Sequence, residues 1–138
     1  MSNSQGNQSR SYRVVIPRPE RMRQLRSSAF GWIDARLLKE GWLSFMEAEE
    51  IAVYLFLCLV ANQQGVSWYR RERIREALNL SEDEVRRALS RLVERDLVAY
   101  APFRRFDSEG FRQVLSLPSL GPSSSEETIS NLRSEKGR

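Results

Sequence analysis

The sequence predicts a mainly α-helical domain with a small β-hairpin. Three segments between residues 44 and 96 carry apolar residues at helical spacing. Two of them begin with serine followed three residues later by glutamate, at Ser44 to Glu47 and at Ser81 to Glu84, which is the spacing of a capping box at a helix start. Two β-prone segments, 97–100 and 111–117, follow the last helix and complete the predicted fold.

The composition of the 138-residue chain fits one folded domain with polar extensions. Hydrophobic residues make up 41% of the chain, which is enough for a compact core. We expect the folded unit at 28–117, between a flexible basic arm over 1–27 and a disordered polar tail over 118–138. Residues 1–40 hold eight basic and three acidic side chains, so positive charge is concentrated there. Within the arm, residues 14–16 could form a short strand that Pro17 interrupts.

The residue content excludes several classes of enzyme and metal site. The chain contains no histidine and one cysteine, so it lacks the usual nitrogen and sulfur ligands of zinc and the Ser-His-Asp and Cys-His catalytic sets. We therefore predict no catalytic centre, no metal and no cofactor. Cys58 lies in the apolar run 51–60 and is expected to be a small buried side chain. That run is well short of the roughly 20 residues that span a bilayer, and the N-terminus lacks an apolar secretory segment, so we predict a cytoplasmic protein without a membrane contact.

The first predicted helices lie between residues 32 and 62. A short amphipathic segment over 32–39 is expected to be helical, with Gly41 ending it in a left-handed conformation. The helix capped by Ser44 extends to about residue 62 and is apolar on nearly all sides. Such a helix is buried either within the domain or against another subunit. A brief strand is expected next, at 66–68.

A second pair of helices follows, joined by a tight turn at Asn79-Leu80. Residues 70–78 form an amphipathic helix, and residues 81–96 form a helix whose apolar residues repeat on one face. Asp96 ends this helix, and an aspartate there must adopt or avoid the left-handed cap conformation at some conformational cost. Segments 97–100 and 111–117 then form a hairpin with a long loop. The face of the 81–96 helix expected to point outward carries Arg86, Arg87, Ser90, Arg91, Glu94 and Arg95.

This order of elements is that of a winged helix-turn-helix. In such a fold the second paired helix lies in the major groove, so we predict that the 81–96 helix reads duplex DNA. Arginines at the preceding helix start would hold phosphates, and arginines in the hairpin loop would reach the minor groove or the backbone. The candidate DNA-binding residues are Arg70, Arg71, Arg73, Arg86, Arg87, Ser90, Arg91, Arg104 and Arg105.

Residues 30–117 resemble the winged-helix superfamily of bacterial DNA-binding regulators and plasmid replication initiators. The matching pieces are 50–57 for the first core helix, 73–81 for the second helix and turn, and 84–100 for the recognition helix and first wing strand. The resemblance implies a non-enzymatic DNA-binding protein, either a transcription regulator or an accessory factor of a plasmid or mobile element. It also implies a homodimer, since paired half-sites multiply affinity. The expected dimer surfaces are the 32–40 helix with Trp42 and the apolar 45–62 helix.

A second interpretation stays open, namely a winged-helix protein-interaction or assembly module without DNA binding. The acidic run 82–84 lies where the helix would enter the groove, and carboxylates near phosphates are unfavourable. The arginines of this helix could instead form a solvated face, with ion pairs such as Arg87 with Glu84 or Arg91 with Glu94. Arginine outnumbers lysine twenty to two, which suits contact with phosphate and guanine but also follows from high-GC codon usage.

Five aromatic residues are expected to have packing roles. Trp32, Trp42 and Trp68 lie at element edges beside apolar residues and are expected to anchor the core or an interface. Phe103 and Phe106 lie in the hairpin loop, where they would either clamp the loop onto the core or contact a partner.

Overall fold

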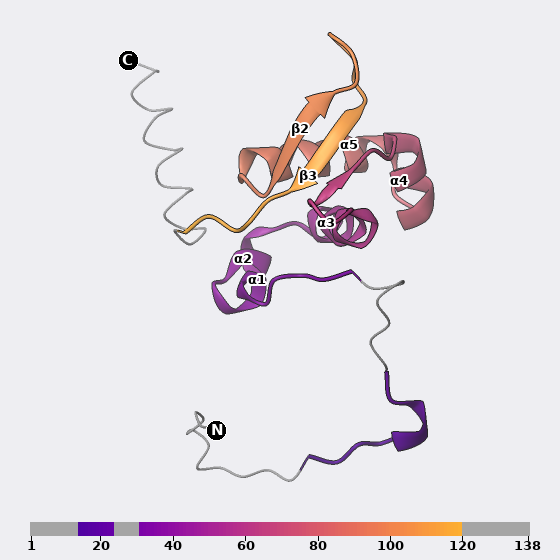
Figure 1. Ribbon diagram of the computed structural model, residues 1–138, viewed down its shortest axis with the longest axis vertical. Helices are drawn as coiled ribbons and strands as arrows, with labels where there is room; N and C mark the ends of the chain where they lie inside the picture. The colour runs from indigo at the N-terminus through magenta and orange to yellow at the C-terminus, as the bar shows by residue number, and fades with distance from the viewer. Residues whose placement is uncertain (1–13, 24–30, 120–138) are drawn as a thin grey trace.

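The computed structural model describes residues 14–23 and 31–119 (Figure 1). Most of the predicted arm and tail lies outside these described residues. Within the described part of the arm, Pro19–Arg21 forms a short 3-10 helix, η2. The strand expected at residues 14–16 is absent there, because none of the described strands pairs with this segment, and its side chains are exposed.

Residues 31–119 form a helical unit with one small sheet (Figure 1). The strands pair antiparallel in the order β1-β3-β2, and β2 and β3 form the predicted hairpin. The order of elements confirms the predicted mainly α winged helix-turn-helix. The elements are α1 (Arg36–Lys39), α2 (Trp42–Phe45), α3 (Ala48–Val60), β1 (Val66–Ser67), α4 (Arg71–Leu78), α5 (Glu82–Glu94), β2 (Val98–Pro102) and β3 (Gly110–Val114).

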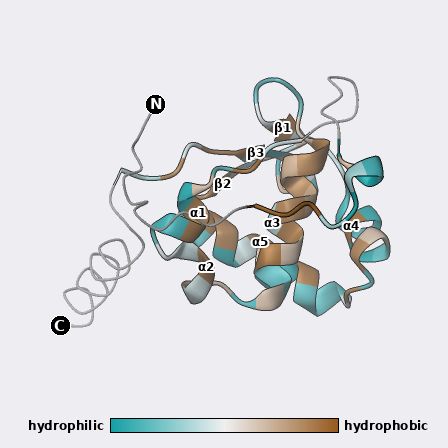
Figure 2. Ribbon diagram, turned by 90° about the horizontal axis from the view of Figure 1, so that it is seen from below, coloured by the Kyte–Doolittle hydropathy of each residue, from teal (hydrophilic) through white to brown (hydrophobic). Residues whose placement is uncertain are grey.

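The hydrophobic core lies where α3, α4 and α5 pack together and against the sheet. The ribbon of α3 is coloured largely as hydrophobic, whereas α4 shows both polar and apolar colours (Figure 2). Burial of each large aliphatic side chain contributes about 1.5–3 kcal/mol, so this packing fixes α5 against the rest of the domain. The large aliphatic side chains that are fully buried here are Val53, Leu57, Ile74, Val85, Leu92 and Val98 of these elements and Leu97 directly before β2.

The start of α3 differs from the sequence prediction. Ser44 is not its cap, because the Ser44 hydroxyl donates a hydrogen bond to the Gly41 carbonyl (2.8 Å) within α2. The cap residue is Glu47, whose side chain accepts from the backbone of Glu50, while the Glu50 carboxylate accepts from the Glu47 backbone N–H (3.0 Å). The same capping box therefore forms three residues later, with glutamate in place of serine.

The single helix predicted over 32–39 is shorter than expected and is followed by a second short helix. Residues 31–34 are not helical, and the Asp34 carboxylate accepts the Arg36 backbone N–H (2.9 Å), so the helix starts only after Asp34. Gly41 adopts the predicted left-handed conformation (φ 81°) between α1 and α2. Of the tryptophans, Trp42 is buried, whereas Trp32 and Trp68 are exposed and do not anchor the core.

The end of α5 confirms the expected cost at Asp96. This residue is left-handed (φ 63°), and the Leu97 backbone N–H returns to the Leu92 carbonyl (3.0 Å). That pattern is the Schellman cap, which favours glycine at the left-handed position because a Cβ crowds the backbone there. The cap turns the chain directly into β2.

Candidate nucleic-acid interface

The tight turn between α4 and α5 sets the geometry of the candidate interface. Asn79 is left-handed (φ 56°), and the Leu80 backbone N–H donates to the Arg75 carbonyl (3.2 Å). Ser81 then caps α5 as predicted, since its hydroxyl accepts the Glu84 N–H (3.1 Å) and the Glu84 carboxylate accepts the Ser81 N–H (2.8 Å). Because Val85, Ala88, Leu89 and Leu92 are buried, the opposite face of α5 points to solvent.

Four of the predicted contact residues share that outward face of α5: Arg86, Arg87, Ser90 and Arg91 are all exposed. Arg86 forms an ion pair with Asp83 (3.0 Å), and the Arg87 Nε donates to the Asp83 carbonyl (3.4 Å). Both contacts lie at the surface, where such interactions contribute only a few tenths of a kcal/mol. The guanidinium groups therefore stay available to a partner.

The two ion pairs suggested for this face, Arg87 with Glu84 and Arg91 with Glu94, are not among the ion pairs of the described residues. Glu84 is unsuited to pair with Arg87 because its carboxylate turns back toward Ser81 in the capping box. The pair that forms instead joins Arg86 and Asp83.

Arg95 does not lie on the outward face, contrary to the prediction. Its side chain is 10% exposed and pairs with Glu50, which is fully buried (Nε to Oε2, 2.8 Å). The Arg95 Nη2 also donates to the Phe45 carbonyl (2.8 Å). Arg95 is the C-cap residue directly after α5, and its side chain turns toward the end of α2 and the start of α3, where these acceptors lie.

The start of α4 places three predicted phosphate-binding arginines in different surroundings. Arg70 and Arg73 are exposed, and the Arg70 guanidinium lies 5.7 Å from the centre of the Phe103 ring in the hairpin loop. Arg71 is half-buried, and its Nε lies 3.8 Å from the Glu109 carboxylate. The structure thus gives Arg71 an internal ion pair, whereas Arg70 and Arg73 face solvent.

Glu109, which sequence reasoning missed, joins α4 to the hairpin. Both of its carboxylate oxygens accept the backbone N–H of Arg71 (3.2 Å each) at the first position of α4. The α4 cap residue, Arg70, offers no side-chain cap of its own, so a carboxylate from 38 residues along the chain supplies the negative charge that a helix start favours. No local spacing rule detects a cap from so far away.

Arg112 on β3 completes this cluster beneath the hairpin. Its side chain is 6% exposed, its Nη1 donates to the Tyr69 carbonyl (3.3 Å), and its Nη2 lies 3.9 Å from Glu109. Burial lowers the pKa of Arg112, and the nearby Glu109 carboxylate opposes that shift. Arg71, Glu109 and Arg112 together hold the hairpin at a fixed place relative to α4.

The loop over 103–109 carries the remaining predicted contacts. Arg104 and Arg105 are exposed. Phe103 packs edge-on against Phe111 of β3, with ring centres 5.0 Å apart, so it clamps the loop onto the sheet. Phe106 does not share this role, because it is 91% exposed.

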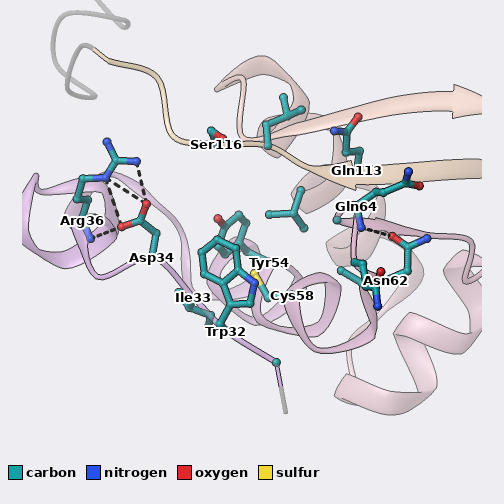
Figure 3. A pocket seen from close by; sticks show the side chains of 16 residues that line it. Trp32, Ile33, Asp34, Arg36, Tyr54, Cys58, Asn62, Gln64, Gln113 and Ser116 are labelled. Carbon is teal, nitrogen blue, oxygen red and sulfur yellow. Dashed lines mark hydrogen bonds and ion pairs between the residues drawn. The ribbon is translucent and has the colours of Figure 1, made fainter. Parts of the chain in front are cut away.

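A separate cavity of about 490 Å³ lies between residues 31–36, α3 and the end of β3 (Figure 3). Burial raises the pKa of the Tyr54 hydroxyl and of the Cys58 thiol, so both are neutral at pH 7. At the rim, hydrogen bonds from Arg36 lower the pKa of the Asp34 carboxyl. None of the lining residues belongs to α4, α5 or the 103–109 loop, so this cavity is distinct from the candidate interface.

Neither a metal cluster nor a membrane span is found in the described ranges. No group of three or more histidine, cysteine, aspartate or glutamate side chains among residues 14–23 and 31–119 could hold a metal ion. In the same residues, no helix is both long and apolar enough to cross a bilayer.

The chain is similar to known proteins over part of its length. Residues 46–98 match the family model of a helix-turn-helix domain. A solved structure of a double mutant of ZitR from Lactococcus lactis, in its apo form, is similar over 74% of this chain and 72% of that chain, with 20% sequence identity and a TM-score of 0.35. No curated protein matches the chain.

Proposed function

We propose that this chain, which carries a winged helix-turn-helix domain, is a non-enzymatic cytoplasmic protein that reads duplex DNA with α5. Its role would be that of a transcription regulator or of an accessory factor of a plasmid or mobile element. The observation that carries the proposal is the outward face of α5, where arginines stand on a helix whose other face is buried in the core.

The geometry of α5 suits major-groove contact. The groove admits an α-helix, and an arginine that projects from it can donate two hydrogen bonds to a guanine. Arg87 and Arg91 are one turn apart and Ser90 lies between them, so their side chains share one side of the helix. The exposed acids Glu82 and Asp83 lie in the first turn, so we expect the helix to contact bases through its middle.

The remaining arginines would bind the DNA backbone around that contact. Arg70 and Arg73 at the start of α4 are proposed to hold phosphates, and Arg104 and Arg105 to reach the adjacent groove or backbone. Arg71 has a smaller part in this proposal, because Glu109 already neutralises its charge.

The test is a fluorescence-anisotropy titration of the protein against mixed-sequence duplex DNA at low and moderate salt. Binding is expected to weaken steeply with salt, since each phosphate contact contributes about 0.9 to the slope of log K against log salt. Arg87→Ala and Arg91→Ala should each weaken binding by about tenfold, measured on a duplex that the wild-type protein selects from a random pool. The control is Lys39→Ala, which removes an exposed positive charge from α1. Wild-type affinity in both arginine variants would remove α5 as the reading helix.

The second candidate function is a protein-interaction or assembly module. The exposed carboxylates of Glu82 and Asp83 favour it, because they lie at the helix end that approaches DNA in a helix-turn-helix and one of them already pairs with Arg86. Absence of duplex binding by the wild-type protein even at low salt, together with co-purification of a defined protein partner, would make this the better account.

Homodimerisation is also part of the proposal, and the structure changes the surface we assign to it. Trp42 is 1% exposed and therefore cannot contact a second subunit, whereas Leu55 and Leu59 of α3 remain exposed at 42% and 59%. Leu55→Glu with Leu59→Glu should turn a dimer into a monomer in size-exclusion chromatography with light scattering, without unfolding it. A wild-type monomer at the highest concentration used would exclude the dimer.

A further inference from the structure

The tip of the β2–β3 hairpin presents a single aromatic ring to solvent. The loop projects past the helices (Figure 1), and Phe106 is 91% exposed, more than any other large hydrophobic side chain of the described residues. Exposing a phenyl ring to this extent forfeits its burial energy. The Phe106 ring is therefore accessible to a partner.

Phe106 is held in a defined turn. The Asp107 backbone N–H donates to the Arg104 carbonyl (2.9 Å), which makes Phe106 the third residue of a β-turn, with φ 65°. Glycine or asparagine is usual at a left-handed turn position, because a side chain with a Cβ is strained there by about 1–2 kcal/mol. Phe106 therefore occupies this turn position with backbone strain that glycine would not have.

Hydrogen bonds at the base of the loop fix this turn in place. The Tyr100 hydroxyl donates to the Asp107 carbonyl (2.9 Å), and the Asp107 carboxylate accepts the Glu109 N–H (2.9 Å). The Phe103 N–H donates to the carbonyl of Glu109 (3.0 Å), the residue whose carboxylate attaches the hairpin to α4. The Phe106 ring thus projects from a turn that is already ordered, so little entropy is lost when it contacts a partner.

The charges beside the ring point to nucleic acid. Arg104 and Arg105 are exposed, and the Arg105 guanidinium lies 5.0 Å from the centre of the Phe106 ring. The nearby carboxylate of Asp107 already accepts a hydrogen bond within the loop. An exposed ring with an arginine beside it suits the minor groove, where arginine meets negative potential and apolar side chains enter between base pairs.

We propose that Phe106 is a wedge that enters the minor groove, partly unstacks one base step and bends the duplex beside the site read by α5. This inference rests on the proposed DNA-binding function. It adds a deformation of the DNA, and hence a preference for flexible pyrimidine–purine steps at a position outside the major-groove contact.

The test uses a duplex of about 30 base pairs selected by the wild-type protein from a random pool, labelled at its two ends with a donor and an acceptor dye. Phe106→Gly is the main variant, because glycine adopts φ above zero and keeps the turn while the ring is lost. Phe106→Trp keeps an aromatic wedge. Arg105→Ala serves as the electrostatic comparison, and equal thermal unfolding of the variants checks the fold.

Wild-type protein and Phe106→Trp are expected to increase energy transfer between the duplex ends, as bending shortens their separation. Phe106→Gly should lose most of this increase and bind on the order of tenfold more weakly, as expected for the loss of one aromatic–base contact. Its salt slope should stay unchanged, whereas Arg105→Ala should lower the slope by about one. If Phe106→Gly binds and bends the duplex as wild type does, the wedge is refuted while DNA binding stands. Failure of the wild-type protein to select any duplex would instead refute the proposed function itself.

Discussion

Arg95→Met tests the internal ion pair that holds the end of α5 against the start of α3. Arg95 donates to Glu50 Oε2 (2.8 Å) and to the Phe45 carbonyl (2.8 Å). Glu50 is fully buried and also completes the capping box of α3 by accepting the Glu47 N–H (3.0 Å). Methionine keeps much of the aliphatic volume of arginine, so the main effect is the loss of charge and of these hydrogen bonds.

The expected loss in the free energy of unfolding is about 3–5 kcal/mol. The charge-assisted hydrogen bonds from Arg95 to Glu50 and to Phe45 disappear, and such bonds are worth about 1.5–3 kcal/mol each. The Glu50 carboxylate stays buried without its ion-pair partner, and removing one partner of a buried pair costs about 3–5 kcal/mol. Small domains have a total stability of about 5–15 kcal/mol, so this change would remove a large share of it.

Urea unfolding at pH 7, followed by circular dichroism, measures this loss. With a slope of about 1–2 kcal/mol per molar urea, the midpoint should fall by roughly 2 M or more. Arg91→Met, which removes an exposed arginine one turn earlier on the same helix, should change stability by less than about 0.5 kcal/mol. The double variant Glu50→Met with Arg95→Met should recover much of the loss. An Arg95→Met midpoint close to that of wild type would refute the reasoning.

Three further predictions concern the hairpin cluster, the α5 cap and the buried thiol. Glu109→Gln should lower stability by about 1–3 kcal/mol, because the buried Arg112 loses its carboxylate, whereas the matched exposed change Glu82→Gln should have little effect in the same urea titration. Asp96→Gly should stabilise the protein by up to about 1 kcal/mol and raise its thermal unfolding midpoint, since glycine relieves the strain at φ 63°. A lowered midpoint would contradict the strained cap. Burial raises the pKa of Cys58 and of Tyr54, so the unfolded chain releases these protons at lower pH than the native protein does. Their contribution to the free energy of unfolding is therefore complete below the ordinary thiol pKa of about 8.5 and declines as pH rises above it. In urea unfolding measured from pH 8 upward, Cys58→Ala should lose less stability with rising pH than the wild type does. An equal loss in both proteins would exclude Cys58 as a cause.

Local patterns in the sequence predicted the order of the elements from α3 to β3 and the buried side of α5. The spacing of Val85, Ala88, Leu89 and Leu92 predicted which face of α5 is buried, because a helix of 3.6 residues per turn brings these positions together. The Ser81–Glu84 capping box and the left-handed Gly41 were equally local and were confirmed. These features depend on neighbours within one turn of the chain, so periodicity and capping rules detect them.

Tertiary packing sets which polar side chains form contacts inside the domain. Helical spacing predicted Arg95 on the outward arginine face, but its side chain pairs with Glu50, which is 45 residues away in the sequence. Glu109 caps α4 across 38 residues and attaches the hairpin to it, while Phe106 is left exposed at the loop tip. These outcomes depend on how α3, α4, α5 and the hairpin pack in space, because only that packing brings a charge next to its partner or leaves a side chain in solvent. Helical periodicity thus predicted the outward face of α5. Long-range contacts then removed Arg95 from that face and fixed the hairpin against α4.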